Sequence, residues 1–320
     1  MKNIRRKVKL RIVFLGTPEF AVPSLNMLSE QGYEVCAVIT QPDRPKGRGH
    51  KFVAPPVKLR AQELGIPVYQ YEKISREGLD FLKELAPDLM ITAAFGQILS
   101  NKVLAIPKYG CINVHASLLP EYRGAAPIER AIMDGKTRTG ITTMYTVREV
   151  DAGDILEQDM LPILPEDTGG SLREKLAQLG AVTLQRTLEK LQKGTLERHP
   201  QQEEQVTYAA MFEKGFGKVD FTKPAQQIVN LIRGANPEPG AYTFLGDVKI
   251  KLMFAQVEEG EYAGAPGEIL LANAKQGLIV AAGEGAVRIL RLQYPGAKEM
   301  RAEDFLRGKG KMLQQGMRLC

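Results

Sequence analysis

Hydrophobic positions in the first half of the chain follow two alternating patterns. Short apolar runs rich in β-branched residues, typical of buried strands, occur at 11–16, 33–40, 88–94, 111–116 and 140–147. Segments with apolar residues at helical spacing lie between them, at 18–31, 57–64, 75–86 and 127–133. This alternation predicts an α/β domain with a doubly wound, mostly parallel, Rossmann-like sheet that continues through the 140–147 strand to about residue 165.

The pattern changes in the second half. Ser171 and Glu174 form a capping-box pattern, and the leucines that follow predict a long amphipathic helix ending near Gly194. A polar stretch and a helix at 224–233 then precede short alternating strands separated by turn signals. The predicted organisation is a catalytic α/β domain at 1–195, a linker at 196–208, and a smaller, OB-like β-barrel at 209–320.

Composition excludes several classes of protein. The chain has 320 residues, 44% hydrophobic and 25% charged, as in ordinary globular proteins. Its apolar runs are too short for a membrane span or a signal peptide. The three cysteines are widely spaced and odd in number, which argues against a disulfide framework or a zinc site. We therefore expect a cytoplasmic protein without a metal or a membrane partner.

The net charge is +6, and the basic residues that are informative about a partner are concentrated in one short segment. Six basic residues fall within the first eleven positions, so the rest of the chain is balanced. The densest internal cluster surrounds a single acid, Asp43, and contains Arg44, Lys46, Arg48, Lys51, Lys58 and Arg60. Such a cluster in an irregular Gly- and Pro-rich segment favours an anionic partner, although a solvated charge run is the usual alternative.

Candidate chemistry centres on one of only three histidines. Asn113 and His115 lie on the same face of a predicted strand because strand side chains alternate. An amide there can donate to a developing oxyanion, and an imidazole can carry a proton. Asp151, which follows the next strand, can accept a proton or stabilise an imidazolium. From these patterns alone, a polar strand end is the better explanation of Asn113 and His115, and an ordinary polar turn is the better explanation of Asp151.

Several segments together resemble the methionyl-tRNA formyltransferases, which transfer a formyl group from 10-formyltetrahydrofolate to the amino group of methionine on initiator tRNA. The matching segments are FLGTPEFAVPSL (14–25), VITQPDRPKGRG (38–49), FGQIL (95–99), INVHASLLPEYRGAAPIERAI (112–132), VDAGDIL (150–156) and IRGANPEPGAYT (232–243). The resemblance implies that Asn113, His115 and Asp151 are catalytic, and that initiator methionyl-tRNA and the folate are the partners.

The resemblance also implies binding residues. Folate contacts are expected at Phe95, Gly96, Gln97, Ile98, Leu99, Ser117, Leu118, Leu119 and Pro120, with a cis peptide at Leu119–Pro120. Contacts with tRNA are expected at Arg44, Lys46, Arg48 and Lys51, in a loop similar to the basic insertion of the tRNA enzymes. The OB-like domain would add a tRNA-binding surface, and we expect a monomer.

Three single positions and one short segment depart from the family pattern. Glu238 replaces the usual tryptophan, which removes a packing anchor from the second domain. Phe95 replaces the commoner tyrosine, and the approach to Asp151 reads Arg148-Glu149-Val150. Glu121 stands where a basic residue is common, so that contact is not expected here.

Three other functions would share some of these sequence features. A formyltransferase of the same superfamily acting on a UDP-amino-sugar or another small amine shares the catalytic trio. A non-catalytic RNA-binding protein explains the basic loop but gives the trio no role. A nicotinamide dehydrogenase is excluded because the turn after the first strand lacks the G-x-G-x-x-G fingerprint.

Overall fold

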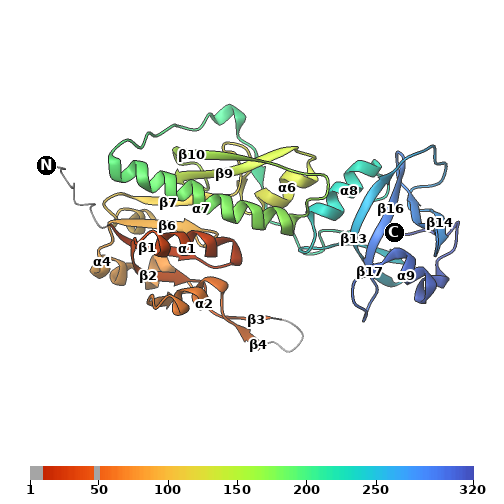
Figure 1. Cartoon of the computed structure of the whole chain (residues 1–320), viewed down its shortest axis with the longest axis horizontal. Helices are drawn as coiled ribbons and strands as arrows, with labels where there is room; N and C mark the ends of the chain where they lie inside the picture. The colour runs from red at the N-terminus through yellow and green to blue at the C-terminus, as the bar shows by residue number, and fades with distance from the viewer. Residues whose placement is uncertain (1–9, 47–50) are drawn as a thin grey trace. The chain divides into compact units, whose positions relative to one another are not determined.

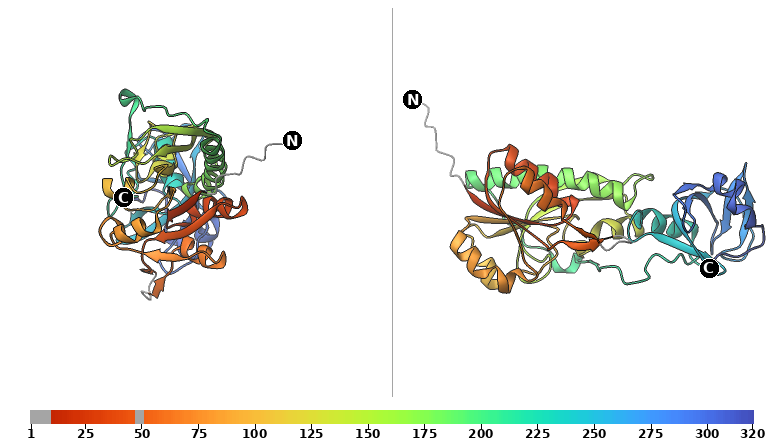
Figure 2. Two further views of the ribbon diagram at one scale, coloured as in Figure 1. Left: turned by 90° about the vertical axis from the view of Figure 1, so that its left-hand side faces the viewer. Right: turned by 90° about the horizontal axis from the view of Figure 1, so that it is seen from below.

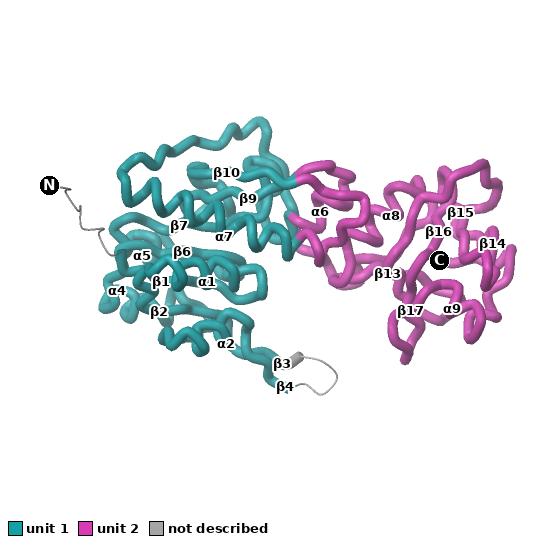
Figure 3. The backbone as a smooth tube through the Cα atoms, in the orientation of Figure 1, with its two compact units in different colours: residues 1–127, 139–161, 173–209 teal, residues 128–138, 162–172, 210–320 magenta. Residues whose placement is uncertain are grey.

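The computed structural model describes residues 10–46 and 51–320, which form two compact units (Figure 3). Unit 1 contains the described residues up to 127, together with 139–161 and 173–209. Unit 2 contains 128–138, 162–172 and 210–320. No helix among the described residues is long and apolar enough to cross a bilayer.

Unit 1 is built on a seven-stranded sheet (Figure 1). Its order is β10-β9-β7-β6-β1-β2-β5. The strands are β1 (Arg11–Gly16), β2 (Glu34–Thr40), β5 (Val68–Gln70), β6 (Leu89–Ala93), β7 (Cys111–His115), β9 (Arg138–Tyr145) and β10 (Ile155–Pro162). The ladders among β7, β6, β1, β2 and β5 are parallel, which confirms the predicted mostly parallel sheet.

One strand direction differs from the prediction. Strand β9 runs antiparallel to β7, with Tyr145 opposite Ile112 and Thr142 opposite His115. The expectation that the 140–147 strand continues the parallel sheet was therefore wrong. The physical reason is that strand periodicity reports which face a side chain occupies and carries no information on strand direction.

Helices cover both faces of this sheet, with α1 and α7 on one face and α4 on the other (Figure 2). Both faces of β1 and β6 are buried as a result, which explains their continuous apolar sequence. The predicted helix at 75–86 is two helices that meet at Gly78. The helices, including the 3-10 turn η1, are η1 (Glu19–Ala21), α1 (Val22–Glu30), α2 (Pro56–Glu63), α3 (Ile74–Glu77), α4 (Leu79–Leu85), α5 (Asn101–Leu104), α6 (Pro127–Met133) and α7 (Gly169–Lys193).

The capping box predicted at Ser171 would start the long helix at residue 172, but α7 begins three residues earlier, at Gly169. Thr168 and Ser171 form the reciprocal cap: each side-chain oxygen accepts a hydrogen bond from the other's backbone N–H, at 3.0 and 3.1 Å. Ser171 is thus the inner member of the cap, and the predicted Ser171–Glu174 box is shifted by one turn.

Two short pairings complete unit 1. Strands β3 (Arg44–Lys46) and β4 (Lys51–Val53) form an antiparallel hairpin after β2. Strands β8 (Arg123–Gly124) and β11 (Tyr208–Ala209) pair in parallel. The polar segment before β11 contains the short 3-10 turn η2 (Glu203–Gln205), and its His199 bridges Ile155 of β10.

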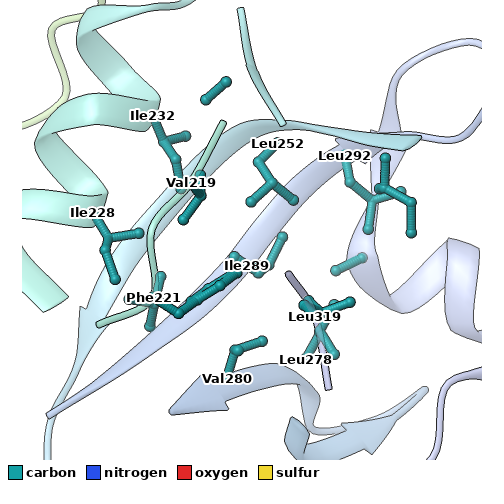
Figure 4. Packing of buried hydrophobic residues seen from close by; sticks show 14 of the residues in the cluster. Val219, Phe221, Ile228, Ile232, Leu252, Leu278, Val280, Ile289, Leu292 and Leu319 are labelled. Atoms are coloured by element: carbon teal, nitrogen blue, oxygen red, sulfur yellow. The ribbon is translucent and has the colours of Figure 1, made fainter. Parts of the chain in front are cut away.

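Unit 2 contains an antiparallel sheet with the order β12-β13-β16-β15-β14, and β17 pairs with β16. Its core combines residues of α8, the strands and the C-terminal segment (Figure 4). Its elements are α8 (Ala225–Gly234), β12 (Ala241–Leu245), β13 (Val248–Glu258), β14 (Ile269–Asn273), β15 (Gly277–Ala281), β16 (Ala286–Gln293), β17 (Met300–Arg301), α9 (Ala302–Arg307) and η3 (Lys309–Met312).

The last residues of the chain join the two edge strands of this sheet. Ile269 of β14 donates its N–H to the Met317 carbonyl at 2.7 Å. Phe244 of β12 and Cys320 exchange two backbone hydrogen bonds, at 2.8 and 3.0 Å. The segment therefore closes the sheet into a small barrel, as predicted. Glu238, which replaces the expected tryptophan, lies exposed on unit 2, so its side chain takes no part in the core.

Candidate active site

The three predicted catalytic side chains meet beside β7. Nδ1 of His115 lies 3.5 Å from Oδ2 of Asp151. Nδ2 of Asn113 lies 3.5 Å from Oδ1 of the same carboxylate. His115 is only 5% exposed, whereas Asn113 and Asp151 are half-buried. The structure thus brings an amide, an imidazole and a carboxylate together where a substrate can reach two of them.

Asp151 reaches this place by a longer route than the sequence suggested. Because β9 is antiparallel, Tyr145 at its end lies level with Ile112, near the start of β7. The loop 146–154 must return along β7 to bring Asp151 to His115. Asp151 has a φ of 51°, a left-handed conformation that is uncommon outside glycine, and the Gly124 N–H donates to its Oδ2 at 2.8 Å.

The amide of Asn113 has a fixed orientation. Thr92, its neighbour in register on β6, donates its hydroxyl to Oδ1 of Asn113 at 2.8 Å. The oxygen end of the amide is therefore occupied, and its nitrogen end faces Asp151. Since an amide nitrogen carries two hydrogens, Asn113 retains an N–H that can be donated to a substrate oxygen.

The ring of His115 is also fixed. Nε2 lies 3.0 Å from the carbonyl oxygen of Tyr122, which can only accept a hydrogen bond, so Nε2 carries a proton. The nitrogen that can exchange a proton is then Nδ1, which faces Asp151. The arrangement can stabilise negative charge on a carbonyl oxygen and move a proton between His115 and a bound reactant.

The predicted folate loop follows β6 directly, next to β7. Phe95 and Leu99 are buried in the core below the sheet. Gln97 donates to the Tyr71 carbonyl and accepts from the Ile74 N–H, so its side chain holds the loop in place. Gly96 and Ile98 are exposed, the latter by 72%. Of the five predicted residues, these two are exposed, and Gln97 is half-buried.

The second predicted folate segment, Ser117 to Pro120, is held tightly after His115. The Ser117 hydroxyl donates to the Glu121 carbonyl at 2.6 Å. The backbone N–H of Leu119 donates to the Thr142 hydroxyl at 3.1 Å. The expected cis peptide is present at Leu119–Pro120. Leu119 is buried, while Leu118 and Pro120 are half-buried.

Three of the four predicted tRNA residues, Arg44, Lys46 and Lys51, lie on strands β3 and β4. Arg44 is exposed and forms an ion pair with Glu72, and Lys51 is exposed on β4. Lys46 ends β3, and Arg48 lies outside the described residues. An exposed aromatic side chain, Phe52, stands beside these charges with 74% of its surface accessible.

The base of the hairpin is tied to the folate loop. Nε2 of Gln41 donates to the carbonyls of Phe95 and Gly96, at 3.3 and 3.1 Å. Lys58 holds Asp43 with two hydrogen bonds of 2.9 Å, and these bonds lower the pKa of the Asp43 carboxyl. The hairpin is therefore anchored to the same edge of the sheet as the loop 95–99.

The residues that hold Asn113, His115 and Asp151 in place have no clear signal in the sequence. Thr92 could have been found from the register of two buried strands, but register is not visible in one sequence. The backbone groups of Tyr122 and Gly124 carry no side-chain signal. Gln201 donates to the carbonyls of Asp151 and Gly153 from a segment that looks like an ordinary polar linker.

Other chemistry near the trio is limited. Burial raises the pKa of the Cys111 thiol to about 12, so this cysteine stays protonated and is a poor nucleophile. In the part of the chain that the structure describes, no group of three or more His, Cys, Asp or Glu side chains could hold a metal ion.

Comparison with known proteins gives consistent matches over both units. A family model described as formyl transferase matches residues 10–188, and one described as formyl transferase, C-terminal domain, matches 211–310. The methionyl-tRNA formyltransferase of Geobacter metallireducens is 49% identical over 97% of this chain and 98% of its own length. That of Acetivibrio thermocellus is 48% identical over 93% of this chain and 96% of its own.

Solved structures share the fold at low identity. HypX from Aquifex aeolicus, in complex with tetrahydrofolic acid, is 18% identical with a TM-score of 0.63 over 96% of this chain, which spans 48% of HypX. WlaRD, a sugar 3N-formyl transferase, is 17% identical with a TM-score of 0.64 over 91% of this chain and 99% of its own. At these coverages, both matches extend over residues of unit 1 and of unit 2.

Proposed function

We propose that this chain, which belongs to the methionyl-tRNA formyltransferase family, transfers the formyl group of 10-formyltetrahydrofolate to the α-amino group of initiator methionyl-tRNA. The observation that carries this proposal is the convergence of Asn113, His115 and Asp151 beside β7. An oriented amide donor, a proton carrier and a carboxylate are the groups that acyl transfer to an amine requires.

The residues present fit a folate co-substrate. When bound, 10-formyltetrahydrofolate supplies an activated formyl group and a nitrogen leaving group. The exposed Gly96 and Ile98 lie in the loop after β6, the strand that pairs with β7, and offer main-chain groups and apolar surface, as a flat heteroaromatic ring needs. The tightly held segment from Ser117 to Pro120 provides a rigid wall after His115.

Asn113 and His115 act on the charge that develops on the formyl oxygen as the amine adds. Thr92 fixes the Asn113 amide with its N–H groups outward, so this donor is already oriented before the reaction. Preorganised donors of this kind stabilise a developing oxyanion without reorganisation. Because Nε2 of His115 is held by the Tyr122 carbonyl, Nδ1 is the nitrogen through which His115 would give a proton to the leaving nitrogen of the folate.

Asp151 stabilises the positive charge on His115 and accepts the proton that the attacking amine loses, directly or through water. The amine itself needs little activation, because an α-amino group has a pKa of about 7.7 to 8.0. A useful fraction is therefore neutral near pH 7, and the main task of the site is to stabilise charge.

The β3–β4 hairpin supports tRNA as the acceptor. Arg44 and Lys51 provide positive charge on an exposed projection, and Phe52 adds an aromatic face on which a base can stack. Gln41 connects this hairpin to the loop beside the trio. We propose that the OB-like barrel of unit 2 also binds the tRNA.

A sugar nucleotide or another small amine is the second candidate acceptor, because WlaRD shares the fold. Its 17% identity carries only the architecture. The two near full-length relatives named above, at 48% and 49% identity, are methionyl-tRNA formyltransferases, and they favour the tRNA.

The test is formyl transfer from 10-formyltetrahydrofolate to initiator methionyl-tRNA, with a UDP-amino-sugar and free methionine as parallel acceptors. We expect Asn113→Ala to lower kcat by roughly 10²- to 10³-fold and His115→Ala by roughly 10²- to 10⁴-fold. His199→Ala is the matched control, because the His199 side chain is 61% exposed.

Turnover confined to methionyl-tRNA, lost in both variants and kept in the control, supports the proposal. Turnover with the sugar nucleotide alone would replace the acceptor and keep the site. Retained tRNA binding without any folate-dependent turnover would leave a non-catalytic RNA-binding protein.

A further inference from the structure

We propose that Gln201 is a positioning residue that sets the distance between His115 and Asp151. This inference rests on the proposed function, since it concerns the same site. Gln201 belongs to the polar segment between the long helix α7 and strand β11, outside all the motifs that carried the resemblance.

The side chain of Gln201 joins the backbone of Asp151 and Gly153 to the side chain of Arg123. Its Nε2 donates to the carbonyls of Asp151 and Gly153, each at 2.8 Å. Its Oε1 accepts a hydrogen bond from Nε of Arg123 at 2.9 Å. Both hydrogens of the amide nitrogen and its carbonyl oxygen are thus used, and only an amide supplies this combination of two donors and an acceptor.

The segment around Arg123 holds both partners of the catalytic pair. On one side of Arg123, the Tyr122 carbonyl accepts from Nε2 of His115 at 3.0 Å. On the other side, the Gly124 N–H donates to Oδ2 of Asp151 at 2.8 Å. The backbone to which Gln201 donates begins with Asp151 itself. Gln201 therefore braces the two pieces of chain whose separation fixes the approach of carboxylate to imidazole.

The Asp151 segment needs such a brace because its conformation is demanding. Asp151 has a left-handed φ of 51°. A Cβ on Gly153 would lie 1.8 Å from the Tyr145 carbonyl oxygen, so the backbone there already packs against β9 on one side. Gln201 donates to the backbone carbonyls of both residues and so supplies two of the hydrogen bonds that this turn needs.

Gln201 is itself held firmly. His199, two residues earlier, exchanges two backbone hydrogen bonds of 2.9 Å with Ile155 of β10. Glu203, two residues later, forms a 2.7 Å ion pair with the buried Arg123. Thr207 accepts the Tyr122 N–H through its hydroxyl at 2.8 Å. These contacts hold the backbone on both sides of Gln201, so its side chain has a fixed starting point.

The test uses three variants of the full chain. Gln201→Met keeps the length of the side chain and removes all three hydrogen bonds. Gln201→Glu keeps the acceptor for Arg123 and removes the donors to Asp151 and Gly153. Gln202→Met is the matched control on the exposed neighbouring side chain. The measurements are kcat, KM for both substrates, and thermal unfolding.

We expect Gln201→Met and Gln201→Glu to lower kcat per folded enzyme by roughly 10- to 100-fold, with KM values within about twofold, as for a misplacement of about an ångström. Gln202→Met should match the wild type. Because Gln201 acts through Asp151, adding Gln201→Met to Asp151→Asn should cause little further loss.

The outcomes separate this inference from the proposed function. A wild-type enzyme that formylates methionyl-tRNA while Gln201→Met keeps its kcat would overturn the positioning role alone. Loss of thermal stability with normal kcat per folded enzyme, or full additivity with Asp151→Asn, would also overturn it. A wild-type chain without formyl transfer would instead remove the proposed function.

Discussion

The hydroxyl of Thr92 decides which end of the Asn113 amide faces the reactants. It donates to the amide oxygen at 2.8 Å from a position that is 6% exposed. An amide has nearly the same shape in both orientations, so only its hydrogen-bond partners select one of them. This contact, together with the 3.5 Å approach of Nδ2 to Asp151, fixes the orientation of the Asn113 amide.

Thr92→Val removes that donor while preserving the shape of the side chain. We expect kcat to fall about tenfold, because a hydrogen bond is worth roughly 1 kcal/mol and the amide can then turn. Steady-state formylation kinetics would measure this change. Thr92→Ser is the control, since it keeps the hydroxyl. Equal rates for the valine and serine variants would show that the hydroxyl has no orienting role.

Residue-scale prediction succeeded where chemistry and periodicity coincide. Asn113 and His115 could be predicted to share a face because strand alternation fixes it. Thr92 and Gln201 could not, because a threonine in a buried strand and a glutamine in a polar stretch have ordinary explanations. Their roles depend on partners 21 and 50 residues away in sequence.

At the scale of elements, β10 and α7 are joined by charged side chains. Glu157 of β10 forms ion pairs with Arg186 and Lys190 of α7, and its side chain is 11% exposed. Burial pushes the pKa of the Glu157 carboxyl upward, but hydrogen bonds from Lys190 and Arg186 outweigh it and leave this pKa lowered. The pairing therefore stabilises the fold when Glu157 is ionised.

The lowered pKa fixes the sign of a pH effect. The stability that Glu157 contributes is present above its unfolded-state pKa and is lost as the pH falls through the folded-state value. Glu157→Gln should lower the free energy of unfolding by about 1 kcal/mol at pH 7 and by less in acid. Urea unfolding at both pH values measures this difference.

Glu189→Gln is the control for this change, because the ion pair of Glu189 with Lys193 is exposed and 3.9 Å long. Its effect should be within about 0.5 kcal/mol at either pH. A loss for Glu157→Gln that does not depend on pH would contradict the electrostatic explanation.

Elements were predicted more reliably than their directions. The positions of β1, β2, β6, β7 and α6 follow the predicted ranges closely, because each has a clear apolar pattern. The predicted direction of β9 was wrong, although Asp151 still lies beside its predicted partners, Asn113 and His115. The loop 146–154 compensates for the reversed strand, and no sequence pattern reveals such a path.

On the scale of the whole molecule, the barrel of unit 2 depends on the last few residues. Leu319 is 3% exposed and packs in the core, while Met317 in the same segment is 40% exposed. Turn signals predicted the short strands of a barrel. The closing segment could not be predicted, because it is too short to show a strand pattern.

Leu319→Ala should lower the free energy of unfolding of unit 2 by about 2 to 5 kcal/mol, because it leaves a cavity in a packed core. Hydrogen exchange of backbone amides in β12 and β14 should become faster, since both edges lose their tether. Met317→Ala, the exposed control, should have little effect. Equal exchange rates in the two variants would rule out a closing role for Leu319.

The path of the chain between the two units has a consequence for dividing the protein. Unit 2 includes residues 128–138 and 162–172, so most of α6 and the first turn of α7 belong with the barrel. In unit 2, a Cβ on Gly234 of α8 would lie 2.8 Å from Cγ of Met133 of α6, which shows how closely these helices pack. A proteolytic cut at 209 therefore cannot release two self-sufficient fragments. The N-terminal product would carry the trio with the buried face of α6 uncovered, an apolar surface prone to aggregation.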